Sequence, residues 1–337
     1  MDLLLETLSF AAKGFVVFLT AVVTVAVIVS ITRRRRAALP RLEVKKLNAR
    51  FEALGDALRH STLEPKELKE LHKSRKKEKE KPSVATKPHV YVLDFEGDIL
   101  ATSVASLRDE VSAIAAVAKP GDEVVVRLES PGGGVPHYGL AAAQLTRLKE
   151  KKIKLTVCID RVAASGGYMM ACVADQIVAA PFSIIGSIGV VAQVPNVHRL
   201  LKKHDVDFEE LTAGEFKRTV SMFAEITAKG RQKFVDQLDE THGLFKDFVK
   251  TQRPSLDVDK VATGEYWLAK RGLELGLVDS LGTSDDYLLG RVQDANVFQV
   301  SFKPDAPWRK RLGRAAAEMT ERVVITLLTR LQSLQLR

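Results

Sequence analysis

A serine followed by two glycines is the first segment whose residue types could do chemistry. Ser165 precedes Gly166 and Gly167, where the strand-like segment 154–160 has ended and the helix-like run 169–174 is about to begin. A serine at the start of a helix lies in positive potential, and the backbone N–H groups after it point outward. Ser165 is therefore a candidate nucleophile, although a serine in this position more often caps the helix.

A glycine-rich loop is the second such segment. Residues 130–134 read Ser-Pro-Gly-Gly-Gly and follow the apolar run 123–129. Because glycine lacks a Cβ, the backbone N–H groups of the loop can approach a ligand closely. The N–H of Gly166, with that of Gly132 or Gly133, would form an oxyanion hole for a tetrahedral intermediate. A glycine triplet is also a common turn, so this loop alone does not establish catalysis.

A serine nucleophile needs a base, because a free hydroxyl reacts poorly at neutral pH. His137 lies five residues after Gly132 and would allow a Ser-His-Asp arrangement. Lys217 is the other candidate, and it must be neutral to act, which requires burial and a nearby cation to lower its pKa from about 10.4 towards 7–8. Arg218 is adjacent, but an exposed Lys-Arg pair on a loop fits the sequence equally well. Spacing alone does not choose the base.

The elements that must position these residues begin near residue 89. Short runs rich in Val, Ile and Leu alternate there with amphipathic segments, and a long helix is expected over 227–253. Such alternation is typical of an α/β fold whose strands are covered on both faces by helices. The Ser130 and Ser165 segments both follow the carboxyl ends of strands. We expect strands at 89–97, 123–130, 154–160, 176–180 and 188–194.

The strongest membrane signal lies at the N-terminus. Residues 14–31 carry no charge, and as a helix they would span about 27 Å, enough to cross a bilayer. A cleaved signal peptide is the alternative, but the chain starts with Asp2 and Glu6, and four arginines follow the span at 33–36. We therefore expect residues 1–32 to form a retained single-pass anchor. Seven basic residues within fifteen positions after the span place the remainder of the chain in the cytoplasm by the positive-inside rule.

Composition and charge exclude several classes of protein. The 337 residues are 46% hydrophobic and 28% charged, which excludes a disordered chain, a collagen and a polytopic transporter. Residues 1–88 hold 19 Lys and Arg against 10 Asp and Glu, and residues 303–337 hold 8 against 3, which leaves 24 against 29 in the middle. This acidic balance argues against nucleic acid as a partner. Two cysteines, Cys158 and Cys172, cannot build a disulfide scaffold or a multi-cysteine zinc site, and their apolar surroundings indicate buried thiols.

The two basic ends have the pattern of helices. Residues 33–88 are expected to form a basic stalk and linker, with a helix within 42–81 acting as a coiled-coil stalk or a surface helix, and a domain boundary in the segment PSVATKP at 82–88. We expect the catalytic domain over 89–300. Residues 301–337 are expected to form a basic amphipathic helix, which would lie on membrane lipid or pack between subunits. In the helix expected within 42–81, apolar residues recur at helical spacing, at Leu47, Phe51, Leu54 and Leu58.

Several segments together resemble a known family. LESPGGG, DRVAASGGYMMACVAD, APFSIIGSIGVVAQVPN, TAGEFKRT, THGLFKDFVK and VATGEYW are similar to the SohB-like inner-membrane peptidases of the signal peptide peptidase A family, and the likeness runs through most of 89–290. The resemblance implies Ser165 as nucleophile, Lys217 as general base and Ser187 as the residue that orients the lysine. It also implies oxyanion donors at Gly133, Gly132 and Gly166.

The same resemblance implies a ClpP/crotonase-like fold of β-β-α units and a homo-oligomeric ring or dome of subunits. The expected function is that of a membrane-anchored serine endopeptidase that uses a Ser-Lys dyad, without a metal or cofactor, on peptides such as signal-peptide remnants or membrane-protein fragments. The expected location is the bacterial inner membrane. Family analogy often places the catalytic domain on the external, periplasmic side, whereas the arginine cluster at 33–36 favours the cytoplasmic side.

Two other classes of function remain open from the sequence. The same fold hosts acyl-CoA hydratases and isomerases, but a crotonase-type acyl-CoA enzyme would leave Lys217 and Ser187 without a task. A non-catalytic membrane scaffold would not need a serine, a lysine and glycine donor loops together. Reaction of Ser165 with a serine-directed reagent separates the peptidase from both.

Overall fold

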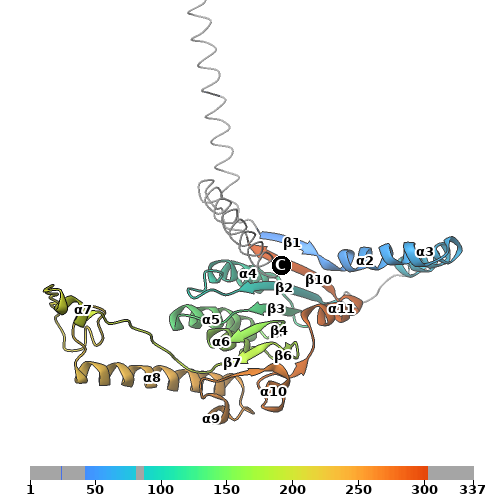
Figure 1. Cartoon of the computed structure of the whole chain (residues 1–337). Coiled ribbons are helices and arrows are strands. Elements are labelled where there is room, and N and C mark those ends of the chain that lie inside the picture. The colour runs from blue at the N-terminus through green and yellow to red at the C-terminus, as the bar shows by residue number, and fades with distance from the viewer. Residues whose placement is uncertain (1–23, 25–41, 81–86, 303–337) are drawn as a thin grey trace, which may run out of the picture. The chain divides into compact units, whose positions relative to one another are not determined.

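The computed structural model describes residue 24 and residues 42–80 and 87–302 (Figure 1). Within them, residues 43–301 form one compact unit. The expected membrane span at 14–31, most of the linker at 82–88 and the tail from 303 lie outside the described residues. Among the residues that are described, no helix is both long and apolar enough to cross a bilayer.

The described residues form two sheets, one of seven strands and one of three. In the larger sheet the strand order is β1-β10-β2-β3-β4-β6-β9, and the pairs from β10 to β9 are all parallel. This mixed α/β arrangement confirms the expected fold class at that level. The strands are β1 (Leu42–Lys46), β2 (His89–Glu96), β3 (Glu123–Glu129), β4 (Lys154–Ile159), β6 (Gln176–Ala179), β9 (Ser280–Leu281) and β10 (Asn296–Phe302).

Helices cover both faces of the large sheet, as the near-continuous apolar strands predict. Val124 and Val126 of β3 face a core shared with α4 (Val104–Val117), α5 (Val135–Glu150), α6 (Gly166–Ala171) and α8 (Ala228–Gln252). Val125, between them, faces a smaller core shared with α2 (Leu47–Thr62) and α11 (Ser284–Asp294). All three valines are fully buried. Because successive side chains of a strand point to opposite faces, β3 contributes to the hydrophobic core on each face of the sheet.

The small sheet contains the strands that precede Ser165 and Ser187. It consists of β5 (Val162–Ala164), β7 (Ile184–Gly186) and β8 (Tyr266–Leu268), in that order. β5 and β7 are parallel, and β7 and β8 are antiparallel. A bridge between Ser130 and Ala163 joins β5 to the end of β3. The other helices of the described residues are α3 (Pro65–Glu80), α7 (His198–Lys203), α9 (Val258–Val261) and α10 (Ala269–Glu274).

Two stretches differ from the predicted elements. Leu42–Lys46, expected to be helical, is the edge strand β1 beside β10, because pairing with β10 outweighs the helical spacing of the residues that follow. Residues 188–194, expected to be a strand, have no regular structure. The positive φ of 50° at Ser187 turns the chain away from β7 before this apolar run begins.

The long helix α8 is close to the predicted one. It begins after Thr227, whose hydroxyl caps it by accepting the N–H of Gly230 at 3.0 Å. Phe245 and Val249 of its second half are buried in the main core. In Figure 1 the segment that carries α7 lies near the N-terminal end of α8, and β7 and α6 lie near its other end. The helix therefore separates these two regions by much of its length.

Candidate active site

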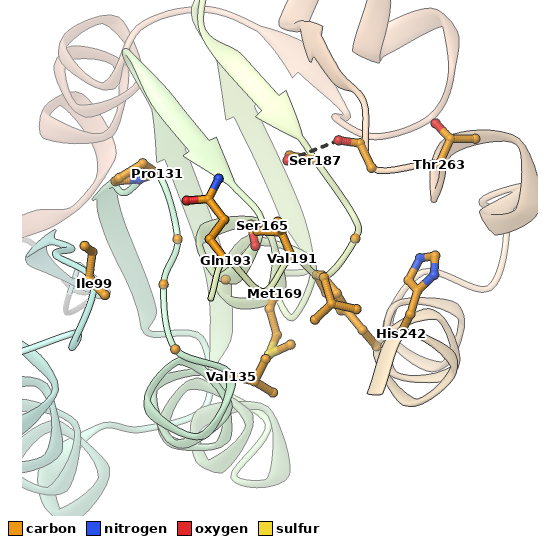
Figure 2. Close-up of a pocket in the computed structure, with 18 residues that line it drawn as sticks. Ile99, Pro131, Val135, Ser165, Met169, Ser187, Val191, Gln193, His242 and Thr263 are labelled. Atoms are coloured by element: carbon orange, nitrogen blue, oxygen red, sulfur yellow. Dashed lines mark hydrogen bonds between the residues drawn. The ribbon is translucent and has the colours of Figure 1, made fainter. Parts of the chain in front are cut away.

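A pocket of about 850 Å³ lies where the glycine loop, the start of α6 and the segment after β7 meet (Figure 2). Val135 of α5 and His242 and Phe245 of α8 complete its wall. The residues that line it are Ile99, Pro131, Gly132, Gly133, Gly134, Val135, Ser165, Gly166, Met169, Ser187, Gly189, Val190, Val191, Gln193, His242, Phe245, Thr263 and Gly264.

Ser165 occupies a sharp turn between β5 and α6. Its φ of 52° and ψ of −118° match the first central residue of a type II′ turn, where glycine is preferred. The turn is held by backbone hydrogen bonds, since the Ser165 N–H donates to Gly186 O at 2.8 Å and the Met169 N–H donates to Ser165 O at 2.9 Å. The Ser165 side chain makes no capping hydrogen bond to α6, so its hydroxyl is not used as a helix cap.

The glycine loop packs directly against this turn. A Cβ on Gly132, where φ is 91°, would lie 2.7 Å from the N atom of Gly166, and a Cβ on Gly133 would lie 2.3 Å from the O atom of Ile99. Real Cβ atoms do not approach backbone so closely, so both positions require glycine. The loop can therefore lie against the start of α6 only because these side chains are absent.

The N–H groups of the loop differ in their partners. The Gly132 N–H donates to Ser130 Oγ at 3.1 Å, and the Gly134 N–H donates to Ile99 O at 2.9 Å. Across the part of the chain that the structure describes, the N–H groups of Gly133 and Gly166 have no acceptor among the hydrogen bonds of loops and turns. Gly166 is the first residue of α6, where an N–H has no intrahelical acceptor. Gly133 and Gly166 thus offer two donors at the pocket.

Ser187 lies beside Ser165 because their strands are paired in register. Ala164 of β5 is the partner of Gly186 in β7, and each serine is the next residue along its strand. Ser187 Oγ donates to Gly264 O at 3.3 Å (Figure 2), and the Ser187 N–H donates to Glu265 O at 2.7 Å. Ser187 also has a positive φ, of 50°. The pairing explains how two serines that are 22 positions apart line one pocket.

Lys217 is not brought to this pocket within one chain. It is exposed, and it does not line the pocket. The preceding residue, Phe216, packs against the first two turns of α8, with its ring 5.7 Å from the Nζ atoms of both Lys229 and Lys233. His242, which does line the pocket, is nine residues after Lys233, or about 13 Å further along the helix. His137, the other candidate base, is exposed on α5 and is not a lining residue either.

His242 is a pocket residue that the sequence did not reveal. Its Nε2 lies 3.2 Å from Ile188 O, the same carbonyl that accepts the Gly264 N–H at 3.2 Å. A carbonyl only accepts, so Nε2 carries the proton, and the ring anchors the segment that follows Ser187. Two signals were available: its place one turn before Phe245 on a helix and its presence in the segment THGLFKDFVK. Neither distinguishes a pocket residue from a surface one.

The two cysteines are buried, as predicted. Cys158 lies in β4 and Cys172 directly after α6, and both are free. Burial raises the pKa of each thiol to about 12, which keeps both protonated and unreactive at neutral pH. Within the described residues, no three or more His, Cys, Asp or Glu side chains are grouped as metal ligands would be.

Comparison with known proteins identifies the family. Residues 147–297 match peptidase family S49, and residues 2–145 match the N-terminal part of that family, described as peptidase family S49 N-terminal. The chain belongs to peptidase family S49. It is 49% identical to the probable protease SohB of Haemophilus influenzae, over 94% of this chain and 93% of that protein. It is 46% identical to the probable protease SohB of Buchnera aphidicola subsp. Schlechtendalia chinensis, over 86% of this chain and 100% of that one.

These matches confirm the resemblance found in the motifs, and this S49 chain is a serine peptidase. Among solved structures, the chain is similar to a lysine-to-alanine mutant of the 1510-N membrane-bound stomatin-specific protease in complex with a substrate peptide. That likeness has 13% sequence identity and a TM-score of 0.43, and it covers 69% of this chain and 100% of that one.

Proposed function

We propose that the protein is a membrane-anchored serine endopeptidase in which Ser165 is the nucleophile and Lys217 is the general base. The observation that carries this proposal is the convergence, in one pocket, of a strained serine whose hydroxyl does not cap its helix, a second serine, and two glycine N–H groups that are free to donate. This is the donor and nucleophile set that acyl transfer requires.

The proposed reaction proceeds through an acyl-enzyme. The neutral amine of Lys217 takes the proton of Ser165 Oγ as that oxygen attacks the carbonyl carbon of the scissile peptide. The negative oxygen of the tetrahedral intermediate accepts hydrogen bonds from the Gly133 and Gly166 N–H groups, each worth about 10²–10³ in rate. The lysine ammonium then gives its proton to the leaving amine. Water, deprotonated by the same lysine, hydrolyses the ester and restores Ser165.

Ser187 would orient the lysine. Its hydroxyl proton is used on Gly264 O, so Ser187 Oγ presents lone pairs rather than a proton to an approaching amine. A neutral lysine that donates one N–H to Ser187 Oγ keeps its lone pair free for the Ser165 hydroxyl. The in-register pairing of β5 and β7, in which Ala164 is the partner of Gly186, supports one amine serving both serines.

The lysine is proposed to come from a second copy of the chain. Lys217 is exposed and does not line the pocket. Its neighbour Phe216 contacts Lys233, which lies about 13 Å along α8 from His242 of the pocket wall. The segment that carries Lys217 is rich in exposed apolar side chains. Leu211 is 91% exposed, with Val194, Val206 and Phe208 also exposed. Such a surface is unfavourable in water and is suited to burial between copies. A homo-oligomeric ring or dome of ClpP/crotonase-like subunits would bring Lys217 of one copy to Ser165 of its neighbour.

Apolar peptides fit the pocket as substrates. Ile99, Val135 and Val191 line it and remain exposed, at 74%, 39% and 81%, so an apolar side chain of a substrate would cover apolar surface that water now contacts. With the expected anchor at 14–31, this favours signal-peptide remnants or fragments of membrane proteins at the bacterial inner membrane. We place the catalytic domain on the cytoplasmic side from the charge pattern, with the periplasmic side as the alternative.

Labelling of the full-length protein with a fluorophosphonate tests the nucleophile. We expect wild type to be labelled at Ser165 and Ser165→Ala to be neither labelled nor active on peptides. Ser284→Ala is the matched control, since Ser284 is 2% exposed and hydrogen bonded to Asp160, which directly follows β4. It should be labelled like wild type. A folded wild type that is not labelled would contradict Ser165 as the nucleophile.

A further inference from the structure

A chain of buried hydroxyl groups lies beneath the glycine loop. Ser130 Oγ and Tyr138 Oη are 2.6 Å apart, and both residues are 0% exposed. Ser130 Oγ also accepts the Gly132 N–H at 3.1 Å, while Tyr138 Oη donates to Asp98 O at 2.8 Å. These contacts link the end of β3, the first turn of α5 and the loop after β2.

The direction of every hydrogen bond made by these two buried hydroxyl groups is fixed. A tyrosine hydroxyl has one proton, and here that proton is used on Asp98 O. The 2.6 Å contact must therefore use the proton of Ser130, which leaves only lone pairs on Ser130 Oγ to face the Gly132 N–H. Burial raises the pKa of Tyr138, so the phenol keeps its proton. The order is Gly132 N–H to Ser130, Ser130 to Tyr138, and Tyr138 to Asp98.

The packing around these hydroxyls leaves them little freedom. A Cβ on Gly97 would lie 2.2 Å from Ser130 Oγ and 2.4 Å from Tyr138 Oη, and a Cβ on Gly166 would lie 2.3 Å from the Tyr138 ring. The same tyrosine thus touches the start of α6 with its ring and the support of the glycine loop with its hydroxyl. One side chain connects the two segments that supply the proposed oxyanion donors.

We propose that Ser130 and Tyr138 are positioning residues for the oxyanion hole. The inference rests on the proposed function, in which Ser165 is the nucleophile and the Gly133 N–H is an oxyanion donor. By accepting the Gly132 N–H, Ser130 fixes the peptide group that precedes Gly132. It thereby fixes the start of the next peptide group, which carries the Gly133 N–H. Tyr138 holds the Ser130 hydroxyl in the rotamer in which its lone pairs face Gly132.

The loop needs this support because its own backbone does not supply it. Gly132, with φ of 91°, and Gly133 both lack a Cβ, and glycine rotates between backbone conformations at little steric cost. If the Gly132 N–H lost its buried acceptor, it would be unsatisfied, and the peptide group would turn to find another. The next peptide group, which carries the Gly133 N–H, starts at the Gly132 Cα and would lose its fixed orientation toward the oxyanion.

Tyr138→Phe and Ser130→Ala test the proposal in the full-length protein. Tyr138→Phe keeps the ring that packs on Gly166 and removes only the hydroxyl, and Ser130→Ala removes the acceptor itself. Since loss of one oxyanion donor costs about 10²–10³ in kcat, we expect kcat to fall about 10-fold in Tyr138→Phe and about 100-fold in Ser130→Ala, with KM within about twofold of wild type. Affinity for a peptide aldehyde, whose adduct carries the oxyanion, should fall in parallel with kcat.

Tyr287→Phe and Ser284→Ala are the matched controls. Each removes a hydroxyl that is hydrogen bonded to a carboxylate, of Glu123 or Asp160, at α11, and each should lower the melting temperature without a change in kcat or aldehyde affinity. If Tyr138→Phe kept its kcat and aldehyde affinity within twofold of wild type, or if the controls lost as much kcat, the positioning role would be wrong. The kcat and aldehyde affinity of Ser130→Ala are informative only if that variant folds. If it does not fold, Tyr138→Phe alone tests the positioning role. A wild type that fluorophosphonate fails to label would instead refute the proposed function itself.

Discussion

The backbone N–H of Ser165 donates to the carbonyl oxygen of Gly186 at 2.8 Å, one residue before Ser187. This bond continues the parallel pairing of β5 and β7 for one more residue, so both serines leave the small sheet at the same level. Each then turns with a positive φ, of 52° and 50°. The small sheet therefore fixes the distance between the proposed nucleophile and the proposed lysine-orienting residue, independently of where the lysine originates.

Mixing of two inactive variants tests whether the base comes from another copy. Ser165→Ala and Lys217→Ala should each abolish peptide hydrolysis, because each removes one half of the proposed dyad. In oligomers formed from equal amounts of both, about one quarter of the sites would combine an intact serine with an intact lysine from the neighbour. We expect peptidase activity to return towards that fraction after the variants are refolded or co-expressed together.

The control for mixing is the double variant, Ser165→Ala with Lys217→Ala on one chain, combined with either single variant. Such mixtures contain no complete dyad and should stay inactive. An active Lys217→Ala protein on its own would eliminate the lysine as base. Two inactive single variants that regain nothing, despite forming mixed oligomers, would rule out a dyad shared between copies.

The strained turn at Ser165 predicts a difference between two inactive variants. A non-glycine residue in this conformation costs about 1–3 kcal/mol, and glycine costs about 0.5–1 kcal/mol in unfolded-state entropy. Ser165→Gly should therefore be more stable than Ser165→Ala by about 1 kcal/mol in urea unfolding, with no activity in either. Equal stability of the two variants would show that the turn stores no strain.

The sequence was sufficient for the parts of the site that depend on local pattern. The end of each apolar strand located Ser130 and Ser165, and the structure brings Ser165, Ser187, Gly132, Gly133 and Gly166 to one pocket. Which glycine N–H is free could not be predicted, because that depends on the Ser130 hydroxyl, whose rotamer is set by Tyr138. The sequence shows which glycine N–H groups are candidates, but contacts between distant elements determine which of them is free to donate.

Long-range contacts also explain the errors in the predicted elements. The apolar run 188–194 has the composition of a strand, yet the chain turns at Ser187 and leaves Val191 81% exposed. Leu54 and Leu58 have helical spacing and lie in a helix, but they are 57% and 69% exposed, since only Leu47 and Phe51 of that helix reach the core. Periodicity predicts a face of a helix, and it does not say what covers that face.

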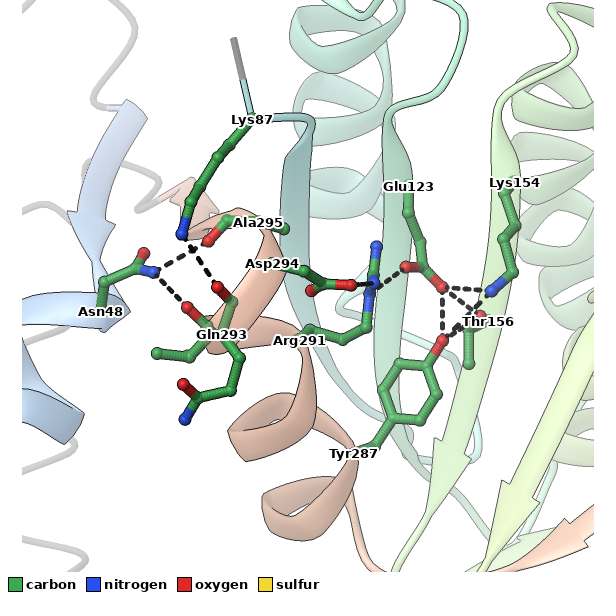
Figure 3. A network of polar contacts seen from close by, with 11 residues as sticks. Asn48, Lys87, Glu123, Lys154, Thr156, Tyr287, Arg291, Gln293, Asp294 and Ala295 are labelled. Atoms are coloured by element: carbon green, nitrogen blue, oxygen red, sulfur yellow. Dashed lines mark hydrogen bonds and ion pairs between the residues drawn. The ribbon is translucent and has the colours of Figure 1, made fainter. Parts of the chain in front are cut away.

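Glu123 predicts an acid-sensitive contribution to stability. Its carboxylate is 2% exposed and accepts hydrogen bonds from Thr156 at 2.6 Å and Tyr287 at 2.5 Å, with Lys154 at 3.0 Å and Arg291 at 2.9 Å (Figure 3). Burial alone would raise its pKa, but the hydrogen bonds outweigh burial and the pKa is lowered. The stabilisation is thus complete above the ordinary Glu pKa of about 4.3 and is lost as the pH falls below it.

Glu123→Gln should therefore change both the level and the pH dependence of stability. We expect it to lower the free energy of unfolding at neutral pH by about 1–3 kcal/mol and to flatten the loss of stability between about pH 5 and 3. Urea midpoints across that range measure both effects. Asp294→Asn is the control, since Asp294 pairs with Arg291 at the surface and is 62% exposed. A Glu123→Gln protein with the acid profile of wild type would refute the assignment.

Asn48 links α2 by hydrogen bonds to the end of α11 and the start of β10. Its Nδ2 donates to Ala295 O at 2.9 Å and to Val292 O at 3.2 Å (Figure 3). Its Oδ1 accepts the Val297 N–H at 2.8 Å. One side chain at the start of α2 thus satisfies three backbone groups, in α11, in β10 and at Ala295 between them. Nothing in the local sequence indicates this, because the partners lie some 245 positions away.

Asn48→Ala should release α2 before it unfolds the domain. Three backbone groups would lose their partner, which we expect to cost about 1–3 kcal/mol, and hydrogen exchange at 47–62 should accelerate more than exchange in the central strands. Leu58→Ala is the control on the same helix, since Leu58 is 69% exposed and its truncation should change stability by less than about 0.5 kcal/mol. If exchange in α2 were the same in Asn48→Ala as in wild type, then β1 pairing and Leu47 burial would be enough to hold the helix.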